Sequence, residues 1–170
     1  MFGLTVGIIG ICERYGLKDK AVDFIKKLSK LTTGGLLSVW LVIRTLSAAF
    51  SLRLGGHVQF IRPIILPMAE GAAYVKFGEI DEKGEDEIKG AAAATENYGN
   101  FYGQNCFMGA SGTLLIVSTL VAQGYEVDAL QIAMASWPIA IVSMVVGIVM
   151  NFFVDRRLVT RYAKKSPAAK

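Results

Sequence analysis

The hydrophobic positions of this chain form long runs that short charged segments interrupt. Residues 129–154 carry no formal charge, and neither do residues 97–125. An uncharged, mostly apolar stretch of about 18 residues or more predicts a membrane-spanning helix. We therefore expect an all-α, polytopic membrane protein made of one domain over residues 1–170, with 129–154 as its final span.

The first 31 residues predict two further elements. Residues 1–12 are apolar, but a helix of that length reaches only about 18 Å. Since the hydrocarbon core is about 30 Å thick, this segment is interpreted as the end of a truncated span. Residues 17–31 place apolar side chains at helical spacing and lysines between them, which predicts a basic helix lying in the membrane interface on the cytoplasmic side.

Residues 32–75 form two apolar arms around the pair Gly55-Gly56. Two interpretations fit: a re-entrant hairpin whose tip lies within residues 45–56, and so near Ser47, or two full spans joined by a short turn. The polar content favours the hairpin, because charged side chains are costly in lipid and tolerable beside a wet cavity. Arg44 is expected to snorkel towards water or to pair with a partner subunit.

Residues 90–123 predict a broken transmembrane helix. The stretch 95–105 mixes glycine, amide and aromatic residues and has weak helix propensity, so we expect the discontinuity inside it. Backbone groups freed at membrane depth survive only beside a cavity or other protein, and broken helices form the binding sites of secondary transporters. The alternative is a surface loop with aromatic anchors at the interface.

Composition and charge agree with a membrane location. Charged residues make up only 19% of the chain, against about 25% in soluble domains, which disfavours a soluble enzyme. The tail 155–170 carries six basic residues and one acidic residue, which predicts a cytoplasmic C-terminus. Counting back from it places the turn 123–128 outside and the charged connector 76–89 inside. The basic residues lie beside membrane segments, so nucleic acid is not an expected partner.

The candidate chemistry is binding, not catalysis. The chain has one histidine and lacks a P-loop, a nucleophile elbow and a dinucleotide fingerprint, so we expect neither an enzyme nor a bound cofactor or metal. Arg62 offers a planar fork suited to a carboxylate, and it either pairs with Glu70 or waits for an anion. Oxygens and amides in 95–100 suit a hard cation or a polar ligand. The candidate substrate-binding residues are Ser47, His57, Gln59, Arg62, Glu70, Thr95, Glu96, Asn97 and Asn100.

Four stretches, residues 13–18, 55–63, 67–73 and 92–97, resemble a bacterial membrane family known by a domain-of-unknown-function number. The resemblance covers about residues 5–158 and is most specific from Gly55 to Ala73. Family members are usually encoded beside a larger sister membrane protein. The resemblance implies that the pair transports pyroglutamate (oxoproline), a small cyclic carboxylate. It also implies that this chain lacks the family's first apolar helices.

We accordingly predict a subunit of a secondary transporter for a small carboxylate such as pyroglutamate. It would act in the bacterial inner membrane with a sister membrane subunit, and Na⁺ or H⁺ would be the candidate coupling ion. The alternative is a non-transporting scaffold or regulatory subunit of a partner membrane protein.

Overall fold

The computed structural model describes residues 31–52 and 54–162. The predicted truncated span lies outside these residues, as do nearly all of the predicted basic helix, Arg53 and the end of the basic tail. Every regular element in the described part is a helix, so the prediction of an all-α chain is confirmed. The elements are α3 (Thr33–Ala49), the π-helix η1 (His57–Ile65), α4 (Leu66–Phe77), α5 (Glu82–Gln104), α6 (Ser111–Ala122) and α7 (Ala129–Tyr162).

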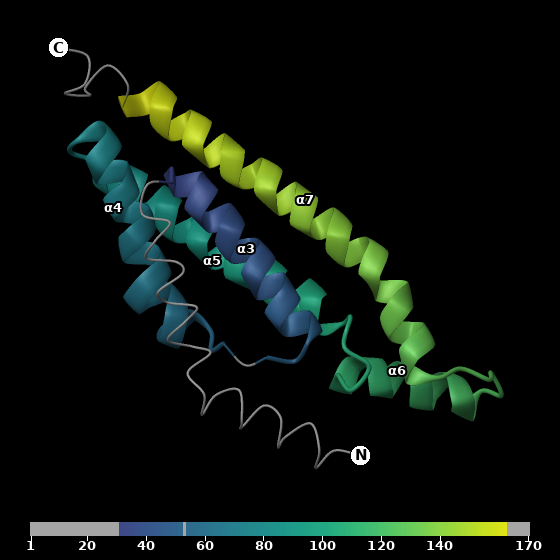
Figure 1. Cartoon of the computed structure of the whole chain (residues 1–170). Helices are drawn as coiled ribbons and strands as arrows, with labels where there is room; N and C mark the ends of the chain where they lie inside the picture. The colour runs from purple at the N-terminus through teal and green to yellow at the C-terminus, as the bar shows by residue number, and fades with distance from the viewer. Residues whose placement is uncertain (1–30, 53, 163–170) are drawn as a thin grey trace.

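Helices α3, α5 and α7 pack along one another, with α3 and α5 in the middle of the molecule and α7 along one side (Figure 1). Glycines mark their closest approaches. A Cβ atom at Gly34 would overlap the backbone carbonyl of Asn151 on α7, and one at Gly103 would overlap the carbonyl of Thr45 on α3. Because the start of α3 meets the late part of α7 while the end of α3 meets the end of α5, α3 runs antiparallel to α7 and parallel to α5.

Residues 32–75 fold into a helical hairpin in which η1 and α4 return along α3. Near the start of α3, the Thr33 hydroxyl donates a hydrogen bond to the carbonyl of Ala69 at 2.9 Å. Further along, the ring of Trp40 stacks on Phe60 with centroids 5.3 Å apart. The return of the chain is common to both interpretations of this segment, the re-entrant hairpin and the two spans.

The returning arm begins with an unusual helix. Residues His57–Ile65 wind as a π-helix with Pro63 inside it, and the N–H of Leu66 donates to the carbonyl of Ile61, five residues earlier. Proline has no N–H and clashes with the carbonyl four residues before it in an α-helix, so the wider turn accommodates it. Gly55, just before this helix, has a φ of 82°, a conformation that glycine adopts without strain.

The helix break lies further along the chain than the sequence predicts. Helix α5 is continuous through Gln104, and α6 begins at Ser111, so the expected discontinuity inside 95–105 is wrong in its location. Packing explains the difference. Gly99 and Gly103, which weaken the helix propensity, are the positions where α3 approaches closely, and tertiary contacts override propensity there. Helix α6 lies at the end of the bundle, beside the start of α7 (Figure 1).

Helix α7 contains the predicted final span and continues as a helix through Tyr162. It has 34 residues, and its apolar part reaches a mean hydropathy of 2.2 over an 18-residue window. Within the described residues it is the one helix long and apolar enough to cross a membrane. Its buried positions form one narrow stripe, and its other faces expose large apolar side chains at almost every turn. The buried stripe consists of Ala133, Ala140, Gly147, Asn151, Val154, Leu158 and Tyr162.

Charged contacts gather at the end of the bundle where α5 begins and α7 ends. Tyr162 donates a hydrogen bond to the Asp81 carboxylate, and Glu87 pairs with Arg157 and Arg161 at 3.4 and 3.3 Å. Asp155 accepts hydrogen bonds from the first turn of α3, where a carboxylate is stabilised by the exposed N–H groups and the helix dipole. The connector and the basic end of α7 therefore lie together.

Candidate functional site

A buried ion pair joins α3 to α5 in the middle of the bundle. The Nε of Arg44 lies 2.6 Å from Oε1 of Glu96, and the two side chains are 9% and 3% exposed. Gly99, one turn after Glu96, makes room for the arginine, because a Cβ there would lie 2.9 Å from the Cβ and Cγ of Arg44. Both charged side chains are therefore tightly packed and almost fully buried.

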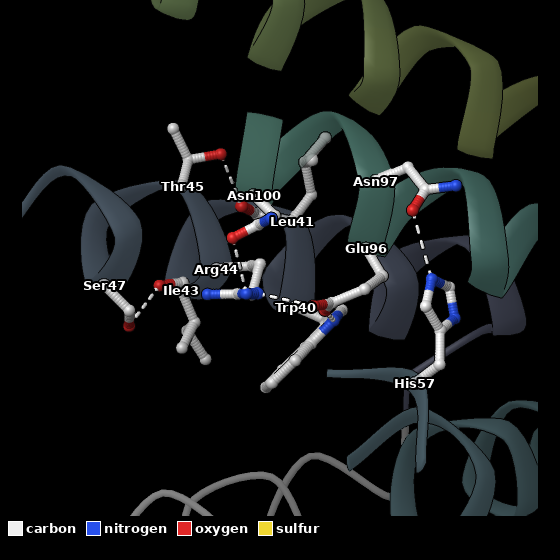
Figure 2. A network of polar contacts seen from close by, with 10 residues as sticks. All are labelled: Trp40, Leu41, Ile43, Arg44, Thr45, Ser47, His57, Glu96, Asn97 and Asn100. Carbon is white, nitrogen blue, oxygen red and sulfur yellow. Dashed lines mark hydrogen bonds and ion pairs between the residues drawn. The ribbon is translucent and has the colours of Figure 1, made fainter. Parts of the chain in front are cut away.

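Two neighbours add hydrogen bonds to this pair (Figure 2). The indole N–H of Trp40 donates to Oε2 of Glu96 at 3.2 Å, so each carboxylate oxygen receives one N–H. The Nη2 of Arg44 donates to Oδ1 of Asn100 at 2.7 Å. These contacts matter because removing one member of a buried ion pair leaves the other charge without a counter-charge and without water.

A second polar contact approaches from the returning arm of the hairpin. Nε2 of His57, the first residue of η1, lies 3.1 Å from Oδ1 of Asn97 on α5. Figure 2 shows this imidazole reaching α5 one residue after Glu96. A Cβ atom at Gly56 would lie 4.0 Å from Oε1 of Glu96, so the start of η1 lies close to the Glu96 carboxylate.

The arginine borders a cavity of about 470 Å³ at the turn of the hairpin. Ligand sites for small molecules are commonly about 300–1,000 Å³, so a small organic acid fits by volume. In the described part of the chain, Nε and Nη2 of Arg44 have partners and Nη1 has none. The cavity is lined by Arg44, Ala48, Ser51, Leu52, Gly55, Gln59, Asn100 and Gln104.

The predicted site residues divide into three groups. His57, Glu96, Asn97 and Asn100 lie in or beside the polar cluster of Figure 2, and Gln59 lines the cavity. Ser47 and Thr95 are buried but engaged elsewhere. The Ser47 hydroxyl donates to the carbonyl of Ile43 within α3, and the Thr95 hydroxyl donates to Oδ1 of Asn151 on α7 at 3.3 Å.

Arg62 and Glu70 form the third group and lie apart from the cluster. Arg62 is exposed on η1 and Glu70 is half-buried on α4. No ion pair involves either of them among the described residues. The structure thus contains no Arg62–Glu70 pair in the described part, which was one of the two alternatives for Arg62.

Sequence reasoning missed the arginine that lies at the centre of the cluster. Arg44 was expected to snorkel or to pair with another subunit, but it is buried and pairs with Glu96 of the same chain. Trp40 was not singled out at all. A signal was present, since Trp40 and Arg44 are four residues apart and so share one helix face. An arginine in an apolar run also requires an acid, and Glu96 is the one acid between residues 90 and 125.

The arrangement can recognise a small polar anion. Arg44 supplies a guanidinium edge next to the cavity, and Gln59, Asn100 and Gln104 supply amides around it. A guanidinium prefers planar carboxylates, and amides can pair with a lactam N–H or carbonyl. Among the described residues, no group of three or more His, Cys, Asp or Glu side chains is placed to hold a metal ion.

Comparison with known proteins gives one match. A family model described as "Protein of unknown function (DUF969)" matches residues 1–159. No curated protein matches the chain, and no solved structure does.

Proposed function

The chain belongs to the DUF969 family, and we propose that it is a subunit of a secondary transporter for small carboxylates such as pyroglutamate. It would work in the bacterial inner membrane with a sister membrane subunit. The observation that carries the proposal is the buried Arg44–Glu96 pair at the wall of a cavity that three amide side chains also line.

Several features support a membrane location. Helix α7 exposes apolar side chains around most of its circumference, and a helix that is apolar on nearly all sides is typical of a lipid or protein environment. Helix α3 has 17 residues and so is about 25 Å long, which is short for a full span of about 30 Å. This length favours the re-entrant interpretation of the hairpin.

The charge distribution supports a cytoplasmic C-terminus. The connector 76–89 and the basic end of α7 lie at one end of the bundle, and the turn 123–128 precedes α7 at the other. Lysine and arginine near membrane segments favour the cytoplasmic side. The hairpin turn, the cavity and the end of α5 then lie away from that side.

The test is uptake of labelled pyroglutamate into vesicles that contain the full chain with its sister subunit. Gln59→Ala removes a cavity amide, and Gln123→Ala removes an exposed glutamine away from the cavity as the matched control. A hydrogen bond to a charged ligand contributes about 1.5–3 kcal/mol, so we expect Gln59→Ala to raise KM roughly 10- to 100-fold. Gln123→Ala should transport normally.

Two results would reject the proposal. One is the absence of uptake by the wild-type pair. The other is equal uptake by the two glutamine variants, which would remove the cavity from the transport path. If the sister subunit then transported alone but was lost from membranes without this chain, the chain would be a scaffold, and its exposed α7 surface would be the contact to map next.

A further inference from the structure

The charge of the Arg44–Glu96 pair sets a condition on any anion that binds there. One guanidinium and one carboxylate make the pair neutral, and both groups are almost fully buried. A bound substrate carboxylate would leave two negative groups facing one arginine. An unpaired buried charge is strongly unfavourable, so the negative charge must be removed or balanced as the anion enters.

The surroundings of Glu96 favour a proton over a metal ion for this task. Its two oxygens are contacted by nitrogen donors, the Nε of Arg44 and the indole N–H of Trp40. The nearby amide oxygen of Asn100 already accepts from Arg44. Hard cations need several oxygen ligands at once, and these oxygens are already hydrogen-bonded to nitrogen donors. A proton needs only one lone pair.

We propose that Glu96 takes up one proton each time a carboxylate binds to Arg44, so that substrate and proton enter together. This rests on the proposed function. The hydrogen bond from Nε of Arg44 to Glu96 breaks, and an O–H bond forms on the Glu96 carboxylate. The guanidinium then pairs with the substrate carboxylate. The site is neutral before binding, and it is neutral afterwards with one substrate anion and one proton added.

Few other titratable groups face Glu96. Arg44 approaches from α3, and His57 approaches from η1 through its bond to Asn97. At this level α7 presents Asn151, which is not titratable. On α4, Glu70 lies within the electrostatic reach of Glu85 and Lys89, which are about two to three turns before Glu96 on α5. His57 is therefore the one rival for the proton among the described residues.

The experiment is calorimetric titration of pyroglutamate into the full chain purified with its sister subunit. Titrations in buffers of different ionisation enthalpy count the protons taken up. For wild type we expect about one proton taken up per bound ligand and, by linkage, a Kd that rises about tenfold per pH unit. Glu96→Gln, a neutral mimic of the protonated acid, should bind without proton uptake and independently of pH.

A matched control and a rival variant make the outcomes distinct. Glu79→Gln removes an exposed acid in the connector and should keep the wild-type proton count. Wild-type binding without proton uptake would overturn the inference while leaving the proposed function intact, and this outcome needs no variant that folds. The inference would also be overturned if proton uptake on ligand binding persisted in Glu96→Gln and disappeared in His57→Gln. A wild-type pair that binds no pyroglutamate at any pH would reject both proposals.

Discussion

Arg44 and Arg62 lie in the two arms of one hairpin, and each is surrounded by apolar residues in the sequence, but their environments differ. Arg44 is on the inner side of α3, where it contacts Glu96 and Asn100 and is closed in by Gly99. Arg62 is on the outer side of η1, exposed and outside any ion pair of the described residues.

The difference shows what decides the fate of a charge in an apolar run. Inside the bundle, a charge is stable only if the neighbouring helix supplies an opposite charge at the same level, because desolvation is large. On the outer surface of the bundle, a charged side chain is not desolvated by the other helices of this chain and needs no partner among them. Arg44 should therefore be sensitive to every change in its packing, and Arg62 should be insensitive to changes within this chain.

Removing the buried acid should have the largest effect. Glu96→Ala leaves Arg44 buried without a counter-charge, and we expect the free energy of unfolding to fall by about 3–5 kcal/mol. Denaturant unfolding in detergent would measure it. Replacing both partners, Arg44→Met with Glu96→Met, should restore most of the loss, since an apolar pair needs no desolvation. A double variant as unstable as Glu96→Ala would contradict this account.

Adding one methyl group beside Arg44, and another on the returning arm of the hairpin, sharpens the comparison. Gly99→Ala places a Cβ 2.9 Å from Arg44, whereas a Cβ at Gly71, next to Glu70, meets nothing within 4 Å. Overpacking costs about 1–3 kcal/mol, so Gly99→Ala should destabilise by that amount. Gly71→Ala should be neutral or stabilise by up to about 1 kcal/mol, because alanine favours the helix. We expect Gly99→Ala to melt below wild type and Gly71→Ala to melt at or above it. The reverse order would contradict the close packing around Arg44.

Truncating the exposed arginine should change stability little. We expect Arg62→Met to alter the free energy of unfolding by no more than about 0.5 kcal/mol, as is usual for surface positions. The same denaturant titration checks it. A loss comparable to that of Glu96→Ala would mean that Arg62 has a partner inside the folded chain. If uptake falls while stability is unchanged, Arg62 acts on substrate or on the sister subunit.

The weakest expected effect is at the solvated start of α5. Hydrogen bonds from Tyr74 and then Lys89 lower the pKa of Glu85 from its ordinary value of 4.5. A carboxylate whose pKa is lower in the folded state stabilises the fold above its ordinary pKa and loses that contribution as the pH falls below it. Tyr74→Phe should therefore flatten the acid side of the stability profile slightly. Thermal melts between pH 3 and 6 would measure this. If the melting temperature changed with pH equally in Tyr74→Phe and in wild type, the prediction would be wrong.

The local sequence predicts the two arms of the hairpin and its turn, but not the residue at which α5 ends. The apolar arms and the turn around Gly55-Gly56 follow from hydrophobic runs and glycines. The position of the helix break did not follow, because the glycines at 99 and 103 look like helix breakers in isolation and are contact points in the bundle. Propensity describes a residue alone, and packing between helices decides such cases.

The sequence by itself determined that the chain is helical, that α7 is long and apolar, and that one end of the bundle is rich in charge. These properties depend on the spacing of residues along a single helix. The tertiary structure alone decided that Arg44 pairs with Glu96, 52 residues away, and that Arg62 remains outside. The physical reason is that the register between two helices determines which side chains meet. Close contacts at glycines set this register, and the local sequence pattern does not show it.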